Sequence, residues 1–156
     1  MKYVAIIPAR YASTRFPGKP LAMLGGKTVI RRVVEQVSKV LDDVYVATDD
    51  TRIYDEVVSF GGKAIMTGSY HKSGTDRIEE AYRKIGKEFD VVINVQGDEP
   101  FIHPSQIVSI MECFASDDTQ IATLGKRFES MESVENANSP KIVTDNKGYA
   151  MYFSRS

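Results

Sequence analysis

The sequence predicts an α/β fold in which helices cover both faces of a mostly parallel β-sheet, and three observations support this class. Short apolar runs alternate along the chain with amphipathic segments of helical length. Glycine, proline and other turn residues follow most of these runs. With 156 residues, the chain is also long enough to bury a core around one sheet. We therefore expect one three-layer domain over residues 1–156, with right-handed crossovers and with ligands bound at the carboxyl ends of the strands.

The first part of the chain alternates between strands and helices. Residues 3–8 form a continuous apolar run, which is typical of a strand buried on both faces, and the run stops at a proline followed by a polar loop. Residues 28–41 place valine, isoleucine and leucine at helical spacing and polar residues on the other face, which predicts an amphipathic helix. Residues 44–47 predict a second buried strand, residues 51–60 a short helix closed by a Gly-Gly pair, and residues 64–66 a third strand.

The alternation continues to the end of the chain. Helices are expected over residues 75–85 and 104–115, and strands over residues 91–95, 121–124, 141–144 and 149–153. Gly86 ends the first of these helices, and Pro104 opens the second. The last two strands flank an Asp-Asn-Lys-Gly turn and predict a hairpin, which would add antiparallel character to the sheet.

The charges of the chain are almost balanced, with 20 lysines and arginines against 21 aspartates and glutamates and a formal net charge of −1. This balance gives no general attraction to nucleic acid or to an anionic membrane, so we expect neither as a partner. The apolar run at residues 3–8 is too short for a signal peptide or a membrane span, and a cytoplasmic protein is expected. Cys113 is the single cysteine, which excludes an intramolecular disulfide, and we expect it in the core.

The densest chemical signal is a basic loop at residues 7–21. It places three cations, Arg10, Arg15 and Lys19, directly after a predicted buried strand. Guanidinium groups can grip phosphate oxygens bidentately, and a lysine adds a movable point charge. Small residues in the loop let backbone N–H groups approach a ligand, and these are Ala12, Ser13 and Gly18. The sequence therefore predicts a triphosphate site, with an ordinary solvated basic loop as the alternative. It is not a Walker motif, because Pro20 follows the Gly-Lys pair.

A second signal is the acidic turn Val95-Gln-Gly-Asp-Glu-Pro100, where another predicted strand ends. An aspartate at the carboxyl end of a strand can hold Mg²⁺ against substrate phosphates, because magnesium is usually bound by one or two carboxylates together with phosphate oxygens and waters. We predict Asp98 as the metal ligand. Glu99 could serve instead, and both could be ordinary turn residues.

Two further motifs have simpler interpretations. His71-Lys-Ser-Gly-Thr-Asp-Arg77 leads into a helix, and Thr75 is a plausible N-cap whose neighbouring amides could bind an anion or a base edge. A plain helix cap is the better local interpretation, with His71 as a surface loop residue. The pair Asp49-Asp50 resembles a metal site, but Asp-Asp-Thr is also a common entry into a helix, and capping is the favoured interpretation.

Taken together and in this order, the motifs closely resemble the 3-deoxy-manno-octulosonate cytidylyltransferases, a family also called CMP-Kdo synthetases. The resemblance covers essentially the whole chain. The matching segments are Ile7 to Leu21, Val46-Ala-Thr-Asp49, Ser73-Gly-Thr-Asp-Arg77, Val95-Gln-Gly-Asp-Glu-Pro100 and Gly148-Tyr-Ala-Met-Tyr-Phe-Ser-Arg155. Related nucleotidyltransferases for sialic acids and sugar phosphates share the fold and a basic first loop. The Tyr-Ala-Ser-Thr-Arg and Gly-Asp-Glu-Pro segments favour the enzymes specific for 3-deoxy-manno-octulosonate (Kdo).

The resemblance implies a Rossmann-like nucleotide-diphospho-sugar transferase fold and the reaction of CTP with Kdo to give CMP-Kdo and pyrophosphate. It also implies Mg²⁺ as cofactor, a role in lipopolysaccharide biosynthesis and a homodimeric full-length protein. Carried over by position, the residues expected to bind the CTP phosphates are Arg10, Ser13, Arg15 and Lys19. Ser73, Gly74 and Gln96 are expected near the nucleotide, and Asp98 on magnesium. Arg77 is expected to help position the nucleotide or the helix. The cations and Asp98 would form the catalytic set by neutralising charge as the anomeric hydroxyl of Kdo attacks the α-phosphate.

The chain ends at Tyr152-Phe-Ser-Arg-Ser156, inside an expected strand or at its exit, without a polar tail or helix cap. We therefore expect the C-terminal part of the domain to be missing. Members of the family continue into a region that supplies a second magnesium-binding aspartate, much of the Kdo site and the dimer contacts. These residues alone are expected to bind CTP weakly and to turn over poorly or not at all.

Two other interpretations stay open. The protein could be a CMP-sialic acid synthetase or another sugar nucleotidyltransferase, which would keep the phosphate loop and change the acceptor pocket. A comparison of Kdo with sialic acid as acceptor separates these enzymes. The chain could also be a catalytically inactive nucleotide-binding module, which would bind CTP without releasing pyrophosphate.

Overall fold

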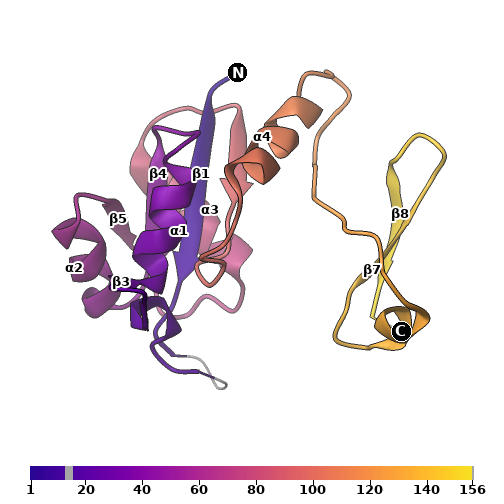
Figure 1. Ribbon diagram of the computed structural model, residues 1–156. Coiled ribbons are helices and arrows are strands. Elements are labelled where there is room, and N and C mark those ends of the chain that lie inside the picture. Colours follow the sequence, from indigo (N-terminus) through magenta and orange to yellow (C-terminus); the bar gives the residue numbers. More distant parts are fainter. Residues whose placement is uncertain (13–15, 156) are drawn as a thin grey trace. The chain divides into compact units, whose positions relative to one another are not determined.

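The computed structural model describes residues 1–12 and 16–155 (Figure 1). Its contacts divide the chain into two compact units, Met1–Glu112 and Cys113–Ser156. The first unit contains a four-stranded parallel sheet with its helices, which confirms the predicted α/β class for this part. The second unit contains a short helix and a hairpin. No helix in the described ranges is long and apolar enough to span a membrane.

The sheet of the first unit has the strand order β5-β4-β1-β6, and every pairing between neighbours is parallel. The strands are β1 (Tyr3–Ala9), β4 (Val44–Thr48), β5 (Lys63–Met66) and β6 (Val91–Asn94). β1 therefore lies between β4 and β6. Its carboxyl end, at Ala9, is level with Thr48 of β4, and Ile6 of β1 is paired with Asn94 of β6. This topology brings the loops that follow β1 and β6 to the same edge of the sheet.

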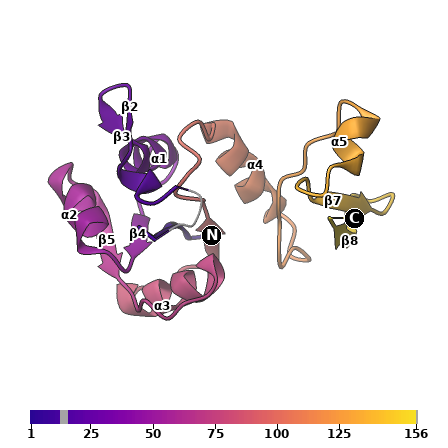
Figure 2. The same cartoon turned by 90° about the horizontal axis from the view of Figure 1, so that it is seen from below.

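Helices cover the two faces of this sheet. They are α1 (Val29–Val37), α2 (Thr51–Ser59) and α3 (Gly74–Ile85), and a fourth helix, α4 (Pro104–Cys113), follows β6 in the chain. Figure 2 shows α1 and α3 on opposite sides of the strands, as the three-layer prediction requires. Three short elements that the sequence did not predict connect β1 to α1. They are the 3-10 turn η1 (Lys19–Leu21) and the two strands of a small antiparallel hairpin, β2 (Met23–Leu24) and β3 (Lys27–Thr28).

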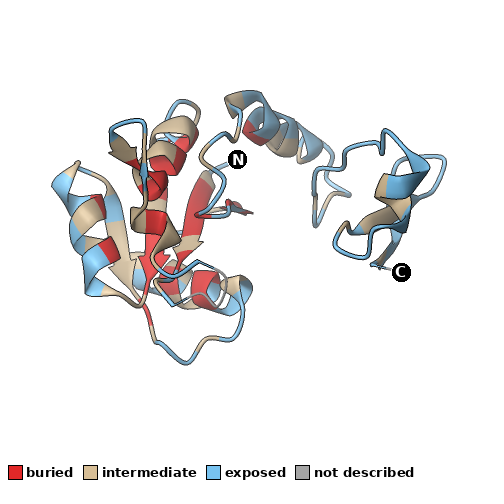
Figure 3. Cartoon of the chain, turned by 60° about the horizontal axis from the view of Figure 1, so that its bottom comes forward, coloured by how far each residue is buried: buried red, intermediate tan, exposed pale blue. Residues whose placement is uncertain are grey.

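The core lies on both sides of β1. Val4, Ala5, Ile6 and Ile7 are each 0% exposed, as expected for a strand covered on both faces. Figure 3 shows the buried residues concentrated on the sheet and on the inner faces of its helices. On one face, Val4 and Ile6 form a cluster with Ile78 and Ala81 of α3. Burial of each large aliphatic side chain contributes about 1.5–3 kcal/mol, so this packing fixes α3 on the sheet.

Helix caps define where the site-bearing helices begin. Asp50 is the N-cap of α2 and accepts a hydrogen bond from the backbone N–H of Arg52 at 3.0 Å, which confirms the capping interpretation. The N-cap of α3 is Ser73, whose Oγ accepts from the N–H of Asp76 at 3.1 Å. The prediction of Thr75 as the cap was wrong, because Ser73 has the extended backbone that a cap requires and α3 begins directly after it.

The second unit differs most from the sequence predictions. The hairpin is confirmed, with β7 (Lys141–Thr144) antiparallel to β8 (Ala150–Ser154). The expectation that it joins the main sheet was wrong, because it forms a two-stranded sheet of its own. Residues 121–124 are not a strand, and Ile121 is 91% exposed, since no described strand pairs with this segment. A short helix that was not predicted, α5 (Met131–Glu135), is capped by Ser130.

The expectation that Cys113 lies in the core was also wrong, because this residue is exposed. It is the last residue of α4, a helix that contributes only Ile107 to the buried residues. A small apolar residue at the end of such a helix is not enclosed by the sheet.

Candidate nucleotide site

Three loops meet at a pocket of about 110 Å³ beyond the carboxyl ends of β1 and β6. One loop follows β1, one joins β5 to α3, and one follows β6. The lining residues are Pro8, Arg10, His71, Ser73, Gly74, Arg77 and Gln96. Four of the predicted nucleotide-binding residues, Arg10, Ser73, Gly74 and Gln96, are thus brought together from distant parts of the sequence. Pockets for whole small molecules enclose about 300 Å³ or more, so this one would hold only part of a nucleotide.

Two glycines allow these loops to approach each other closely at Pro8. A Cβ atom on Gly97 would lie 2.9 Å from the carbonyl oxygen of Pro8, and one on Gly74 would lie 3.3 Å from Pro8 Cγ. The first distance is shorter than real contacts of this kind and involves backbone that cannot rotate away. Gly97 therefore lets the acidic turn after β6 pass against the end of β1, and Gly74 does the same for the start of α3.

Arg77 is a buried cation that holds the loop between β5 and α3. It is 3% exposed. Its Nη2 pairs with Asp49 Oδ2 at 2.8 Å, and its Nη1 donates to Thr67 Oγ1 at 2.6 Å and to the carbonyl oxygen of Gly68 at 3.3 Å. These bonds join the end of β4, the exit from β5 and α3. Its contacts therefore support the helix-positioning part of the prediction for Arg77.

His71 is not the surface loop residue that the sequence suggested. Its side chain is 9% exposed, lines the pocket and contacts Glu80 through Nε2. The structure places it there because Glu80 also accepts the N–H of Gly68 at 3.0 Å, which folds the loop back over α3. Hydrogen bonds from Lys84, from the Gly68 N–H and from His71 lower the pKa of Glu80 from 4.5 to about 2.

This shift makes the contribution of Glu80 to stability depend on pH. Because the pKa of Glu80 is lower in the folded protein than in the unfolded chain, its ionised form stabilises the fold above about pH 4.5, and this contribution is lost as the pH falls towards 2. We expect Glu80→Gln to lower the thermal midpoint at pH 7, and the difference from the unmodified protein to shrink steadily below pH 4.5. Thermal unfolding followed by circular dichroism between pH 7 and pH 2.5 measures it.

The control for this measurement is Glu79→Gln, which changes an exposed glutamate one residue earlier on the same helix. Titrating groups that do not contact Glu80 are common to the two proteins and cancel in the difference. A difference between Glu80→Gln and the unmodified protein that stays constant over the whole pH range would contradict the prediction.

Lys19 and Asp98 connect the basic loop to the acidic turn. Lys19 Nζ lies 2.8 Å from Asp98 Oδ2, and the two side chains are 43% and 53% exposed. Lys19 is the first residue of η1 and follows Gly18, whose φ of 71° is the left-handed conformation that glycine adopts readily. An ion pair this exposed contributes little to stability, so both groups remain accessible to a charged ligand.

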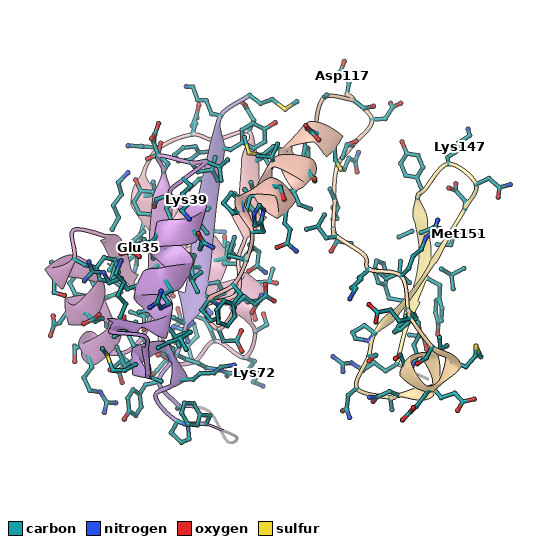
Figure 4. The ribbon with its side chains drawn as sticks, viewed as in Figure 1. Glu35, Lys39, Lys72, Asp117, Lys147 and Met151 are labelled. Atoms are coloured by element: carbon teal, nitrogen blue, oxygen red, sulfur yellow. The ribbon has the colours of Figure 1, made fainter. Side chains whose placement is uncertain are left out.

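Ser13 and Arg15, two predicted phosphate ligands, lie outside the described residues. Lys72, labelled in Figure 4, adds an exposed cation to the loop that carries His71 and Ser73. Across residues 1–12 and 16–155, no group of three or more histidine, cysteine, aspartate or glutamate side chains could hold a metal ion.

A protein family described as cytidylyltransferase matches residues 4–156 of the chain. A 3-deoxy-manno-octulosonate cytidylyltransferase from Bacteroides thetaiotaomicron is 63% identical, over 100% of this chain and 64% of its own length. The protein of the same name from Phocaeicola vulgatus is 60% identical, over 100% of this chain and 63% of its own length. The chain thus spans less than two thirds of the length of these curated relatives.

Solved structures agree with this result. A structure of CMP:2-keto-3-deoxy-manno-octonic acid synthetase complexed with CTP has a TM-score of 0.92 and 44% identity, and the match covers 100% of this chain and 65% of that one. A 4-diphosphocytidyl-2C-methyl-D-erythritol synthase has a TM-score of 0.59 at 17% identity, which is a likeness of fold alone. The nucleotidyltransferase fold and the resemblance expected from the sequence motifs are both confirmed.

Proposed function

Because the chain belongs to the cytidylyltransferase family, we propose that it forms the nucleotide-binding part of an enzyme that transfers CMP from CTP to Kdo and releases pyrophosphate. The observation that carries the proposal is the convergence of Arg10, Ser73, Gly74 and Gln96 on one pocket at the carboxyl edge of the sheet. As the resemblance implies, the whole protein would be a cytoplasmic homodimer that serves lipopolysaccharide biosynthesis.

The charges around this edge suit a nucleoside triphosphate. Arg10 lines the pocket, and Lys19 extends from the other end of the same loop. A guanidinium can bind two phosphate oxygens at once, and the lysine can follow the phosphates as they move, because its side chain is half exposed. Arg15, in the same loop, stays a predicted third ligand. Backbone N–H groups at the start of α3, beside Ser73, can donate to the nucleotide.

Asp98 is the residue proposed to hold Mg²⁺. A carboxylate that is 53% exposed and faces a phosphate-binding lysine fits an ion that takes one or two carboxylates and completes its shell with phosphate oxygens and waters. When bound, the cation would neutralise charge on the phosphates and orient them for transfer. Lys19 would then exchange its carboxylate partner for phosphate oxygens.

The chain's own residues would act mainly by positioning and by electrostatics. The anomeric hydroxyl of Kdo attacks the α-phosphorus of CTP and gives up its proton to solvent, a new O–P bond forms, and the bond to the leaving pyrophosphate breaks. Arg10 and Lys19 hold the phosphate oxygens in place while negative charge shifts onto the leaving group. No covalent bond between enzyme and substrate is needed, so the proposal requires no nucleophilic side chain.

The proposal is tested by pyrophosphate release from CTP, Mg²⁺ and Kdo. The assay compares this chain with the protein expressed to its natural stop codon, and sialic acid serves as the control acceptor. We expect Kdo-dependent release from the longer protein, and weak CTP binding with little or no release from the 156-residue chain.

Release with sialic acid and not with Kdo would instead identify a CMP-sialic acid synthetase. CTP binding without release by either protein would favour an inactive nucleotide-binding module. An Arg10→Ala variant tests whether CTP binds at this pocket. If it releases pyrophosphate with unchanged kcat and KM, CTP binds elsewhere and the assignment of the pocket is wrong.

A further inference from the structure

Tyr11 and Gly18 lie near the two ends of the basic loop and contact each other. The backbone N–H of Gly18 donates to the carbonyl oxygen of Tyr11 at 2.8 Å. The tyrosine ring also lies directly against Gly18, where a Cβ atom would be only 2.9 Å from Tyr11 Cε2. Tyr11 follows Arg10, and Gly18 precedes Lys19. This contact therefore fixes the separation of the two described cations that are proposed to bind phosphate.

A third residue, Arg52 of α2, contacts the ring of Tyr11. Its guanidinium carbon lies 3.4 Å from the centroid of the Tyr11 ring, within the range of a strong cation–π contact. The same guanidinium is held by Asp50 in a bidentate pair, with Nε 2.9 Å from Oδ1 and Nη2 2.6 Å from Oδ2. Asp50 is in turn the N-cap of α2. The ring of Tyr11 is thus enclosed between Gly18 and an arginine fixed at the start of a helix.

We propose that Arg52 is a positioning residue for the basic loop: it holds Tyr11, and through Tyr11 keeps Arg10 and Lys19 correctly spaced before the triphosphate binds. The inference rests on the proposed function for its effect on CTP, although the support that Arg52 gives to the contact between Tyr11 and Gly18 does not depend on it. Arg52 need not touch the substrate. Holding a binding loop in its bound conformation raises affinity because less ordering has to occur on binding.

Two variants test the proposal in the protein expressed to its natural stop codon. Arg52→Ala is expected to raise KM for CTP about three- to tenfold, the range that the loss of one cation–π contact supports, with little change in kcat and in the thermal midpoint. Tyr11→Leu is expected to have a similar effect, whereas Tyr11→Phe, which keeps the ring but removes the hydroxyl that also interacts with Arg52, should have a smaller one. A merely structural arginine would instead lower the thermal midpoint.

The double variant separates positioning from simple attraction of the triphosphate by a positive charge. If Arg52 acts through Tyr11, Arg52→Ala should change KM no further in a protein that already carries Tyr11→Leu. Independent, multiplying effects on KM would overturn the proposal. Arg31→Ala is the matched control, because Arg31 also lies over an aromatic ring, that of Phe60, 5.4 Å away, and is distant in sequence from the loop.

A second readout does not require CTP. Because Arg52 supports the ring that covers Gly18, we expect Arg52→Ala to speed hydrogen exchange of the Gly18 amide in the ligand-free protein, as measured by NMR. Unchanged exchange would overturn the proposal even if CTP binds. If the unmodified protein fails to bind CTP, the proposed function fails, and faster exchange in Arg52→Ala would still support the role of Arg52 in holding Tyr11 against Gly18.

Discussion

Asp49→Asn is expected to lower the free energy of unfolding by about 3 kcal/mol, because it leaves the guanidinium of Arg77 buried without a counter-ion. Arg77 is 3% exposed and cannot turn its charge towards solvent without dismantling the start of α3. The remaining bonds to Thr67 and Gly68 satisfy N–H groups but supply no negative charge. A loss of this size is a large part of the stability of a typical domain, about 5–15 kcal/mol. Chemical denaturation followed by circular dichroism measures it.

Arg77→Met removes the other partner of this ion pair, and it should lower the free energy of unfolding by less than Asp49→Asn does. The carboxylate that it leaves behind belongs to Asp49, whose side chain is 19% exposed and can be reached by water. Which of the two variants loses more free energy of unfolding therefore tests whether burial of the charge is the cause. The double variant, with both Asp49→Asn and Arg77→Met, should be more stable than Asp49→Asn alone. Asp55→Asn, which changes an exposed acid on α2, is the control. A smaller loss for Asp49→Asn than for Arg77→Met would show that the arginine is not buried as described.

Asp98→Asn is expected to reduce kcat for the proposed CMP-Kdo synthesis by at least about a hundredfold and to raise the Mg²⁺ concentration needed for half-maximal rate. Removing a single group that stabilises transition-state charge typically costs ~10²–10³ in kcat. Asparagine keeps the shape of the side chain but provides a neutral ligand. Because the pair of Asp98 with Lys19 is exposed, the thermal midpoint should stay almost unchanged. Steady-state pyrophosphate release over a Mg²⁺ titration measures both effects.

Glu99→Gln is the matched comparison, since it alters the neighbouring acid in the same turn. It should leave the Mg²⁺ dependence close to that of the unmodified protein. The opposite pattern, with a large loss for Glu99→Gln and a small one for Asp98→Asn, would transfer the metal-binding role to Glu99, the alternative that the sequence leaves open. Equal small losses would mean that neither carboxylate binds the catalytic cation.

Elements whose signals come from residues close together in the sequence could be predicted. The apolar run of β1 and the αL glycine that ends α3, Gly86, are local signals, and both appear in the structure. The cap of α3 was harder, because Ser73 and Thr75 both have hydroxyl groups and only the backbone conformation decides between them. The segment at 121–124 has β-branched residues, but no described strand pairs with it, and propensity alone cannot supply a partner.

In the candidate site, too, features local in the sequence could be predicted and contacts between distant residues could not. The residues of the basic loop and the acidic turn were identifiable because their charges follow apolar strands, and Arg10 and Gln96 do meet at the pocket. The contacts that hold the site in place were not identifiable. Arg77 with Asp49 and Arg52 with Tyr11 are pairs of residues far apart in the chain, and only the strand order brings them together. His71 was missed for the same reason, since nothing in its own segment points to Glu80.

The strand order also determines when the pocket can form during synthesis. Of the four strands of this sheet, β1 leaves the ribosome first, yet it occupies an interior place in the order β5-β4-β1-β6. β4 can cover one of its edges early, while the other edge waits for β6, which follows β5 and α3 in the chain. Such late, non-local parallel pairing is slow and leaves an apolar strand edge open to other chains. A nascent chain that ends before β6 therefore lacks one partner strand of β1 and the pocket residue Gln96, and its exposed apolar strand edge favours aggregation at this stage.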